Sequence, residues 1–498
     1  MAHAPRRLPL LFAALLAAAA ATAGAPAPPP KRKGLNHAQL TAELGKLVQA
    51  PALQRAVVGV AVRDLSSGEW LFESQADQLL IVASNNKLAA TAAALELLGP
   101  DFQFRTTVAA VGRIAGGVLY GDLLLTGRGD PSISGRFHNG RTTAVVEQWA
   151  AAVAAAGIKS VRGGIIADDT YFDRQHIHPL WPTNQLSAWY CAPVGALSFS
   201  DNCVLVTVAP GARRGDPARV ALDPPTAYVQ VVNQCTTSRA RSGENRVLVH
   251  RAFGGNPLAV GGEVREKGAP FRTWVAIHDP ALYTATVFAE VLEAKKIPVG
   301  GPVRLRTPTT RIEPADCKEI VTTTSFLKDA VAVANGNSQN FYAEQILKTL
   351  GREKAGKGTW ADGAEAVIEF LRKAGVTGLF SYHDGSGLAR ADRFSPRQIV
   401  QLLSYMNGRR TGPLYLHSLA EPGEPGTLLR RGRLDPLQNR VFAKTGYIAG
   451  VSALSGYLET RGGRMLAFSI LVNDFRCPLG EVRSLQDALC LKLADYEP

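Results

Sequence analysis

Residues 81–100 read IVASNNKLAATAAALELLGP, and the rest of the interpretation builds outward from this stretch. Its second half is rich in alanine and leucine and has no proline or glycine before Gly99-Pro100, which predicts a helix over 87–98. Ser84 and Lys87 stand at the start of that helix with an i, i+3 spacing, so their side chains share one face. A serine at a helix N-terminus lies where the helix dipole stabilises developing negative charge. Ser84 and Lys87 are therefore a candidate nucleophile and base.

For Lys87 to act as a base near neutral pH, its environment must favour the uncharged amine. An ordinary lysine titrates near ~10.4, so a downward pKa shift of roughly three units, or ~4 kcal/mol, is needed. Burial or a second cation would supply it. The S-x-x-K pattern alone is weak evidence, since serine is a common helix cap and lysine a common helix residue.

A second candidate element is Lys444-Thr445-Gly446, on a predicted strand over 440–445 beside another predicted strand over 452–458. A cation on this strand can lower the pKa of Lys87 and bind a substrate carboxylate. Gly446 leaves the strand open to close approach by a substrate.

A third candidate element is Ser338-Gln339-Asn340, immediately before a predicted helix over 341–350. One interpretation is a helix cap, for which serine is well suited. The functional interpretation is a hydroxyl that relays a proton and an amide that holds a peptide carbonyl.

The organisation of the 498-residue chain indicates an exported protein with an interrupted domain. Residues 1–23 have the features of a secretory signal peptide, Arg6-Arg7 before an apolar stretch and an Ala-Thr-Ala cleavage site, and 24–36 those of a flexible leader. Helices are expected over 37–47, 361–374 and 395–406, with strands over 57–62, 69–72 and 465–472. The region 106–317 is instead β-rich, with helices only over 143–156 and 280–294. We expect 37–105 and 318–498 to form one discontinuous catalytic domain, with 106–317 an insertion of two small domains.

The three motifs occur in the order, and in the structural contexts, of the S-x-x-K, S-D-N and K-T-G set of penicillin-binding proteins and class A β-lactamases. The chain resembles the low-molecular-mass class C penicillin-binding proteins, the serine D-alanyl-D-alanine carboxypeptidase/endopeptidase family. This resemblance implies an α/β fold of the α+β type, a penicillin-binding or serine β-lactamase-like transpeptidase domain in which helices flank an antiparallel sheet. Other segments that fit the family are Gly127-Arg128-Gly129-Asp130-Pro131, Ala196–Asn202, His278-Asp279-Pro280, Asp384–Leu388, Gly426-Thr427-Leu428 and Val451–Tyr457.

The resemblance also implies roles for individual residues. Ser84 would be the acylated nucleophile and Lys87 its general base, while Ser338 would relay the proton to the leaving D-alanine. Asn340 would hold the peptide carbonyl. Lys444 and Thr445 would bind the substrate carboxylate, and Gly446 and Tyr447 would also bind substrate. The backbone N–H groups of Ser84 and Tyr447 would form the oxyanion hole. No metal or cofactor is implied.

The chain departs from the family pattern at several positions. Tyr447 follows K-T-G where the family usually has threonine or serine, which bears on carboxylate recognition. Gln339 replaces the aspartate of S-D-N, and Val82 replaces a proline common two residues before the nucleophile. Asn85-Asn86 follow the serine. We expect these changes to tune specificity and to leave the reaction unchanged.

The expected partners are peptidoglycan stem peptides ending in D-Ala-D-Ala, with β-lactams as covalent inhibitors. The net charge is +13, or +11 after loss of Arg6 and Arg7, which suits either attraction to an anionic cell wall or a solubilising surface. No long basic run or nucleic-acid motif occurs, and no second apolar run is long enough for a membrane span. The expected location is therefore the periplasm or the outer cell-wall face, with peripheral membrane association left open.

The six cysteines could form disulfides in such a compartment, and Cys191–Cys203 and Cys477–Cys490 are close in sequence, but the spacing does not choose among pairings. Two alternatives to a peptidase also stay open. One is a β-lactamase or esterase that uses the same serine, against which the long interval between Ser84 and Ser338 speaks. The other is a catalytically silent wall-binding protein, against which the intact Ser84, Lys87 and Lys444 speak.

Overall fold

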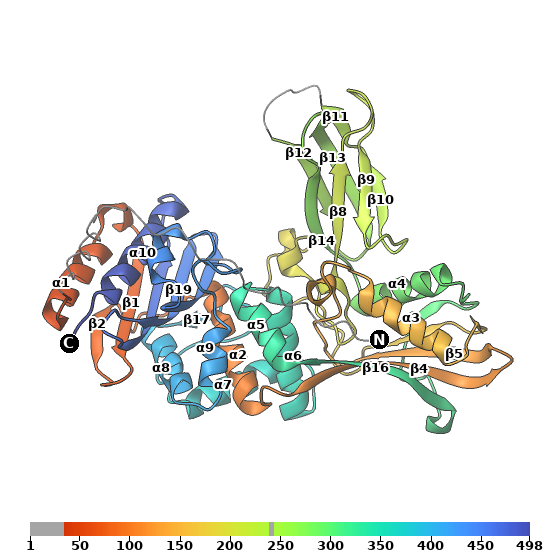
Figure 1. Cartoon of the computed structure of the whole chain (residues 1–498), viewed down its shortest axis with the longest axis horizontal. Coiled ribbons are helices and arrows are strands. Elements are labelled where there is room, and N and C mark those ends of the chain that lie inside the picture. The colour runs from red at the N-terminus through yellow and green to blue at the C-terminus, as the bar shows by residue number, and fades with distance from the viewer. Residues whose placement is uncertain (1–33, 239–243) are drawn as a thin grey trace, which may run out of the picture. The chain divides into compact units, whose positions relative to one another are not determined.

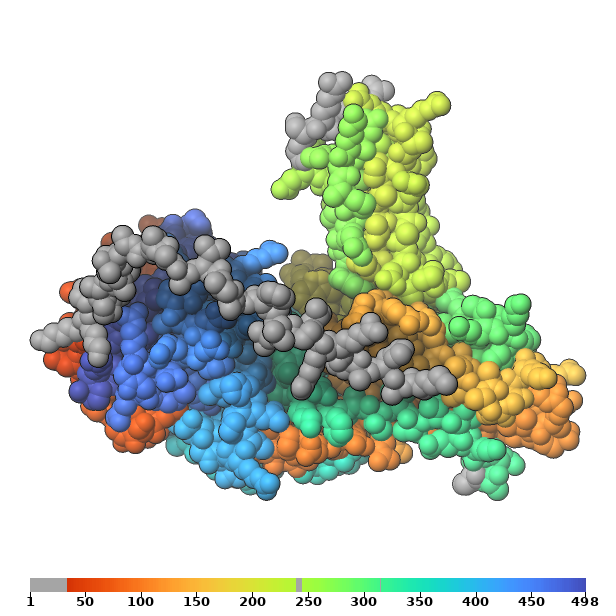
Figure 2. All heavy atoms as spheres, viewed as in Figure 1, coloured from red at the N-terminus to blue at the C-terminus, as the bar shows by residue number. Residues whose placement is uncertain are grey.

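The computed structural model describes residues 34–238 and 244–498. The predicted signal peptide and residues 24–33 of the predicted leader lie outside the described residues. The last leader residues belong to the fold, because Leu35 N–H donates to the carbonyl of Asp495 at 2.7 Å and Asn36 caps the first helix. The described beginning and end of the chain therefore lie together, which Figure 2 shows as adjoining red and blue surfaces.

A five-stranded antiparallel sheet is built from the two ends of the chain (Figure 1). Its strand order is β18-β19-β20-β1-β2. The runs of β-branched residues that predicted strands form them here, and the predicted hairpin is confirmed by antiparallel β1 and β2. The strands are β1 (Val57–Asp64), β2 (Trp70–Ser74), β18 (Val441–Ile448), β19 (Val451–Glu459) and β20 (Met465–Asn473).

Helices cover both faces of this sheet, so β19 and β20 are buried along nearly their whole length rather than at alternate residues. Helices α1 (His37–Val48) and α10 (Leu479–Ala494) pack together over one face, in a core that includes Val60 and Ile470. On the opposite face, Ala61 and Leu471 belong to the core of the central helices, against which α8 packs. These central helices are α2 (Lys87–Leu97), α5 (Leu327–Gly336), α6 (Asn340–Ala355), α7 (Trp360–Lys373), α8 (Pro396–Asn407) and α9 (Gly412–His417). The helices expected from the sequence in these regions are confirmed to within a few residues at their ends, except that α6 extends five residues beyond its predicted end.

A second, six-stranded sheet lies in the region that runs from β4 to β16. Strand β4 pairs with β16 along its length, so the chain leaves and re-enters the helical core on neighbouring strands. The predicted boundaries at 105/106 and 317/318 fall within this strand pair. The elements are β4 (Gln103–Ala115), β5 (Val118–Gly127), β6 (Ser160–Val161), β7 (Ile165–Asp168), β15 (Val303–Leu305), β16 (Cys317–Phe326), α3 (Ala144–Ala155) and α4 (Pro280–Ala294).

Two further sheets complete the β-rich region, and a short strand pair lies in the helical part. One sheet has the order β14-β8-β9 and the other pairs β13 with β10, β11 and β12. The strands are β8 (Cys203–Ala209), β9 (Arg219–Asp223), β10 (Gln230–Asn233), β11 (Thr236–Ser238), β12 (Arg246–Arg251), β13 (Pro257–Arg265) and β14 (Phe271–Ala276), and the short pair is β3 (Leu80–Ile81) with β17 (Arg393–Phe394).

All six cysteines are unpaired thiols. Neither Cys191–Cys203 nor Cys477–Cys490, the pairings that proximity in sequence favoured, is formed. Cys191, Cys203 and Cys490 are buried within apolar clusters, so the apolar cores themselves stabilise these regions. Within the described ranges, none of the helices is both long and apolar enough to cross a lipid bilayer.

Candidate active site

Ser84 and Lys87 meet at the start of α2, as the i, i+3 spacing predicts. Ser84 lies on the 3₁₀ turn η2 (Ala83–Asn86), which leads directly into the helix. The Lys87 ammonium donates to Ser84 Oγ at 2.9 Å. The preceding Ala83 has a φ of +46°, a strained value for a residue with a side chain, and such strain is commonly stored at functional sites.

Lys87 is fully buried and hydrogen-bonded by groups from three parts of the chain. Besides Ser84, its Nζ donates to Asn340 Oδ1 at 2.7 Å and to the carbonyl of Ser386 at 2.9 Å. Burial lowers the pKa of Lys87 to about 7, although the negative charges of Glu344 and Asp384 act in the opposite direction. The environment therefore provides the uncharged amine that a lysine base requires.

Lys444 lies on β18 and is also fully buried, with its ammonium donating to the carbonyl of Thr445 at 2.9 Å. Burial, together with repulsion from Lys87, holds the pKa of Lys444 well below its usual range. The sequence suggested that a second cation would lower the pKa of Lys87. In the structure, burial lowers the pKa of Lys87, and the repulsion between the two lysines lowers the pKa of Lys444 instead.

The Ser338-Gln339-Asn340 segment enters the same site from the start of α6. Ser338 has a φ of +59°, and Gln339, not Ser338, occupies the N-cap position, without a side-chain cap. Asn340 accepts from Lys87 and donates from Nδ2 to the carbonyl of Tyr190 at 2.9 Å. The simple helix-cap interpretation of Ser338 is therefore wrong.

A cavity of about 800 Å³ opens beside these motifs. Ser84, Ser338, Asn340 and the segment Thr445-Gly446-Tyr447 all line it. Lys87 and Lys444 are buried immediately behind this wall. Basic side chains that the sequence interpretation did not single out also line the cavity, namely Arg390, Arg430, Arg431 and Arg483. The cavity can therefore take an anionic substrate against Ser84.

Gly446 allows β18 to approach Ser84 closely. A Cβ atom there would lie 2.9 Å from the carbonyl oxygen of Val82 and 3.1 Å from the backbone nitrogen of Ser84. Asn85, on η2, forms hydrogen bonds to both β18 and β19. With its amide oriented to satisfy both neighbours, it donates to the Lys444 carbonyl at 3.0 Å and accepts from Ser455 Oγ at 2.6 Å.

A tight loop at residues 384–388 also contacts Lys87, through the carbonyl of Ser386. Glu344, four residues after Asn340 on α6, accepts from the backbone N–H groups of Gly385 and Ser386 at 2.9 and 2.8 Å. Asp384 accepts from the N–H groups of Gly387 and Ala389. These bonds aim the Ser386 carbonyl at Lys87.

Glu344 is not among the site residues that the sequence predicts, and the 384–388 segment is predicted only to resemble the family. The available signal was a lone acid, Glu344, in a stretch of helix whose other positions are buried. Burial and the negative charge of Asp384 raise the pKa of Glu344.

The D-Ala-D-Ala carboxypeptidase 3 (S13) family matches residues 40–490 of this chain. The chain belongs to this S13 family. It is 35% identical over 480 residues to the D-alanyl-D-alanine carboxypeptidase of Actinomadura sp. (strain R39), covering 93% of this chain and 86% of that protein. A second relative, the D-alanyl-D-alanine carboxypeptidase DacB of Haemophilus influenzae, is 24% identical over 84% of this chain and 85% of its own length.

Solved structures confirm the fold expected for an S13 protein. Penicillin binding protein 4 (dacB) of Haemophilus influenzae superposes with a TM-score of 0.78 at 23% identity, covering 91% of this chain and 99% of that one. A structure of the same protein complexed with a β-lactam gives a TM-score of 0.72 at 22% identity, over 92% and 100% of the two chains. The α/β fold of penicillin-binding type predicted from the motifs is thus confirmed.

Proposed function

We propose that this chain is an exported serine D-Ala-D-Ala carboxypeptidase that acts on peptidoglycan stem peptides and is acylated by β-lactams. Its S13 family membership and a relative of that activity at 35% identity support the reaction class. The observation that carries the mechanism is the 2.9 Å contact of a fully buried lysine, with its pKa lowered to about 7, to Ser84 Oγ. A buried lysine with this pKa is a base for serine activation near neutral pH.

In the acylation step, neutral Lys87 takes the hydroxyl proton of Ser84 as Oγ attacks the carbonyl carbon of the penultimate D-alanine. The carbonyl oxygen becomes an oxyanion held by the backbone N–H groups of Ser84 and Tyr447, beside the helix N-terminus. The proton then passes through Ser338 to the departing nitrogen, the peptide bond breaks, and D-alanine leaves. Water hydrolyses the ester by the reverse proton path, which regenerates Ser84.

Substrate recognition uses the rest of the cavity wall. Thr445, with Lys444 buried behind it, holds the terminal carboxylate, and Gly446 and Tyr447 lie alongside the substrate backbone. Asn340 has one amide hydrogen engaged by Tyr190, which leaves its second for the peptide carbonyl. Its oxygen holds Lys87 in place. A β-lactam binds against the same cavity wall and acylates the same serine.

The localisation and domain division are part of the proposal. The signal-like segment 1–23 and the net charge of +13 support export to the periplasm or outer wall face. Residues 37–105 and 318–498 form the catalytic domain, with 106–317 inserted. A separate apolar core, whose buried members all lie between Val108 and Ile297, supports this division.

The test combines fluorescent penicillin labelling with D-alanine release from a pentapeptide ending in D-Ala-D-Ala. Wild-type protein should give one adduct, mapped by mass to Ser84, and should release D-alanine. Ser84→Ala should lose both, while Ser66→Ala, at an exposed turn, should lose neither. Labelling retained by Ser84→Ala would overturn the assignment. Rapid drug hydrolysis without D-alanine release would favour a β-lactamase, and wall binding with neither reaction would favour a silent binding protein.

A further inference from the structure

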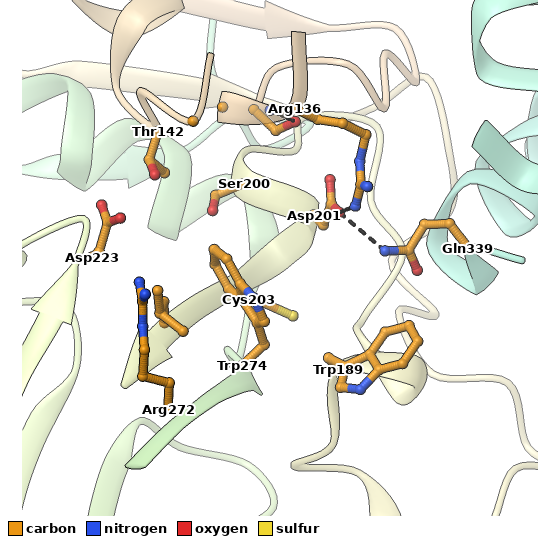
Figure 3. A pocket seen from close by; sticks show the side chains of 14 residues that line it. Arg136, Thr142, Trp189, Ser200, Asp201, Cys203, Asp223, Arg272, Trp274 and Gln339 are labelled. Carbon is orange, nitrogen blue, oxygen red and sulfur yellow. Dashed lines mark hydrogen bonds and ion pairs between the residues drawn. The ribbon is translucent and has the colours of Figure 1, made fainter. Parts of the chain in front are cut away.

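A second cavity, of about 450 Å³ (Figure 3), shares a lining residue with the cavity at Ser84. Trp189 borders both cavities, and Gln339 of the Ser338-Gln339-Asn340 segment lines the second one. None of the residues assigned to acyl transfer lines it. The second cavity is therefore separate from the reacting atoms but shares a wall with them.

Two half-exposed tryptophans face this cavity from adjoining segments. Trp189 and Trp274 are 42% and 41% exposed. Ala188 forms an antiparallel bridge with Val275, so the next residue in one segment, Trp189, stands opposite the preceding residue in the other, Trp274. Exposing indole rings to water is unfavourable in free energy, and backbone pairing holds these two rings as rigid flat surfaces on which a ligand ring can stack.

The opposite side of the cavity is polar. Figure 3 shows Arg136, Thr142 and Ser200 on one side, with Arg272 and the two tryptophans on the other. Asp223, Leu205 and Trp274 lie in register across β9, β8 and β14, which places Asp223 and Trp274 on one sheet face.

Two of these charged side chains are uncommitted. Within the described residues, neither Arg272 nor Asp223 forms a side-chain hydrogen bond or an ion pair. Arg136, in contrast, is paired with Asp201 at 2.6 Å. The lining thus holds two arginines and two aspartates, a balance that suits a neutral, hydroxyl-rich ligand better than an anionic one.

A polar network connects the second cavity to the catalytic segment. Gln339 Nε2 donates to Asp201 Oδ2 at 3.1 Å, and Gln339 is only 7% exposed. Among the described atoms, Gln339 Oε1 and Asp201 Oδ1 have no hydrogen-bond partner. Ser200, Asp201 and Asn202 all have φ values of 51–53°, so this wall is a strained segment of the kind found at ligand sites.

We propose that the cavity between Trp189 and Trp274 is a saccharide subsite that binds an N-acetylated amino sugar of the glycan strand. This inference rests on the proposed function, because that function makes peptidoglycan the substrate. The indole faces stack on the sugar ring, and the free Arg272 and Asp223 bind its hydroxyl and acetamido groups. Since Trp189 borders both cavities, sugar and stem peptide can be held by one continuous surface.

The binding test uses the full-length Ser84→Ala protein and a stem-free oligosaccharide of N-acetylglucosamine, titrated by tryptophan fluorescence. Trp274→Ala in that background should weaken binding at least tenfold. Phe253→Ala, which removes an aromatic ring that is 72% exposed, should leave binding unchanged. Asp223→Asn is the second variant if Trp274→Ala does not fold, and it should weaken binding at least threefold. Oligosaccharide binding that no cavity variant alters would overturn the proposal, as would absence of binding.

The kinetic test compares a free pentapeptide with the same pentapeptide carried on its disaccharide. The wild-type kcat/KM should be at least fivefold higher for the disaccharide-linked substrate. Trp274→Ala should remove this advantage and leave the free pentapeptide unchanged. Equal rates for both substrates in the wild type would overturn the subsite. Trp274-dependent sugar binding without cleavage of either substrate would support the subsite and overturn the proposed function. Trp274-dependent binding of a second stem peptide in place of sugar would reassign the cavity to peptide.

Discussion

Lys87 Nζ lies 2.7 Å from Asn340 Oδ1 and 2.9 Å from Ser84 Oγ, so the amide that starts α6 holds the amine against the Ser84 hydroxyl. The two motifs are 253 positions apart in the chain. Because an amide oxygen accepts a hydrogen bond without carrying a full charge, it orients the amine and leaves it free to lose its proton. We therefore expect the identity of residue 340 to control the pH at which Lys87 can act as a base.

Asn340→Asp should move the acidic limb of the acylation pH profile upward. A carboxylate at this position favours the charged ammonium, so it should raise the pKa of Lys87 from about 7 by roughly 1–3 units. Penicillin acylation at pH 7 should fall at least tenfold and recover at higher pH. The measurement is the second-order acylation rate from pH 5 to 10, with the exposed Asn407→Asp as control. An unchanged acidic limb would contradict the assignment of Lys87 as the base.

Glu344→Gln should move the acidic limb of the acylation pH profile to lower pH. The charge of Glu344 raises the pKa of Lys87, so its removal should move the acidic limb to lower pH. The shift should be modest, because the pKa of Glu344 is itself raised to about 7 and the carboxyl is only partly ionised there. The variant also puts an amide against the N–H groups of Gly385 and Ser386, which should cost about 1–3 kcal/mol of stability. Acylation kinetics and urea unfolding measure the two effects, with the exposed Glu365→Gln as control. A stability loss with an unshifted limb would leave Glu344 a purely structural residue.

Lys87→Met should change how stability depends on pH. The pKa of Lys87 is about 7 in the folded protein and near 10.5 when unfolded, so between these values the unfolded chain binds the extra proton. The lysine therefore costs most stability below pH 7, and this cost is relieved as the pH rises toward 10.5. Wild-type stability relative to Lys87→Met should rise by up to ~1.4 kcal/mol per pH unit in this range. Denaturant unfolding at pH 6, 7.5 and 9 measures it, and parallel stability curves would refute the lowered pKa.

Gly446→Ala should disable acylation. The added Cβ would meet the Val82 carbonyl at 2.9 Å and the Ser84 nitrogen at 3.1 Å, so β18 must move away from the oxyanion position. Loss of one such donor costs about 10²–10³ in rate, which is the expected fall in penicillin acylation. The control is Gly45→Ala in α1, where a Cβ meets nothing within 4 Å and should stabilise the helix by ~1 kcal/mol. Near wild-type acylation by a folded Gly446→Ala protein would show that acylation does not need β18 to lie this close to Ser84.

Local sequence patterns predicted the secondary structure around the site because short-range physics governs it. The alanine-rich run after Lys87 forms α2, the β-branched run from Val57 forms β1, and the predicted strand that carries Lys444 forms β18, all at nearly the predicted bounds. The motif residues Ser84, Lys87, Ser338 and Asn340 are brought together as their order suggested.

Long-range contacts that no local pattern encodes could not be predicted in the same way. The role of Glu344 depends on the loop at 384–388, which meets α6 only after folding. The disulfides that proximity suggested are absent because separation along the chain does not fix the distance between sulfur atoms. The second cavity likewise depends on the bridge between Ala188 and Val275.

The sequence by itself determined the candidate chemistry of this protein, because Ser84, Lys87 and the strand motif at 444–446 are residue types at fixed spacings. Only the tertiary structure decided how that chemistry is tuned. Whether Lys87 is neutral near pH 7 depends on its complete burial and on the opposing charges of Glu344 and Asp384. A pKa responds to solvation and to charges in space, and both are set by packing between segments hundreds of residues apart.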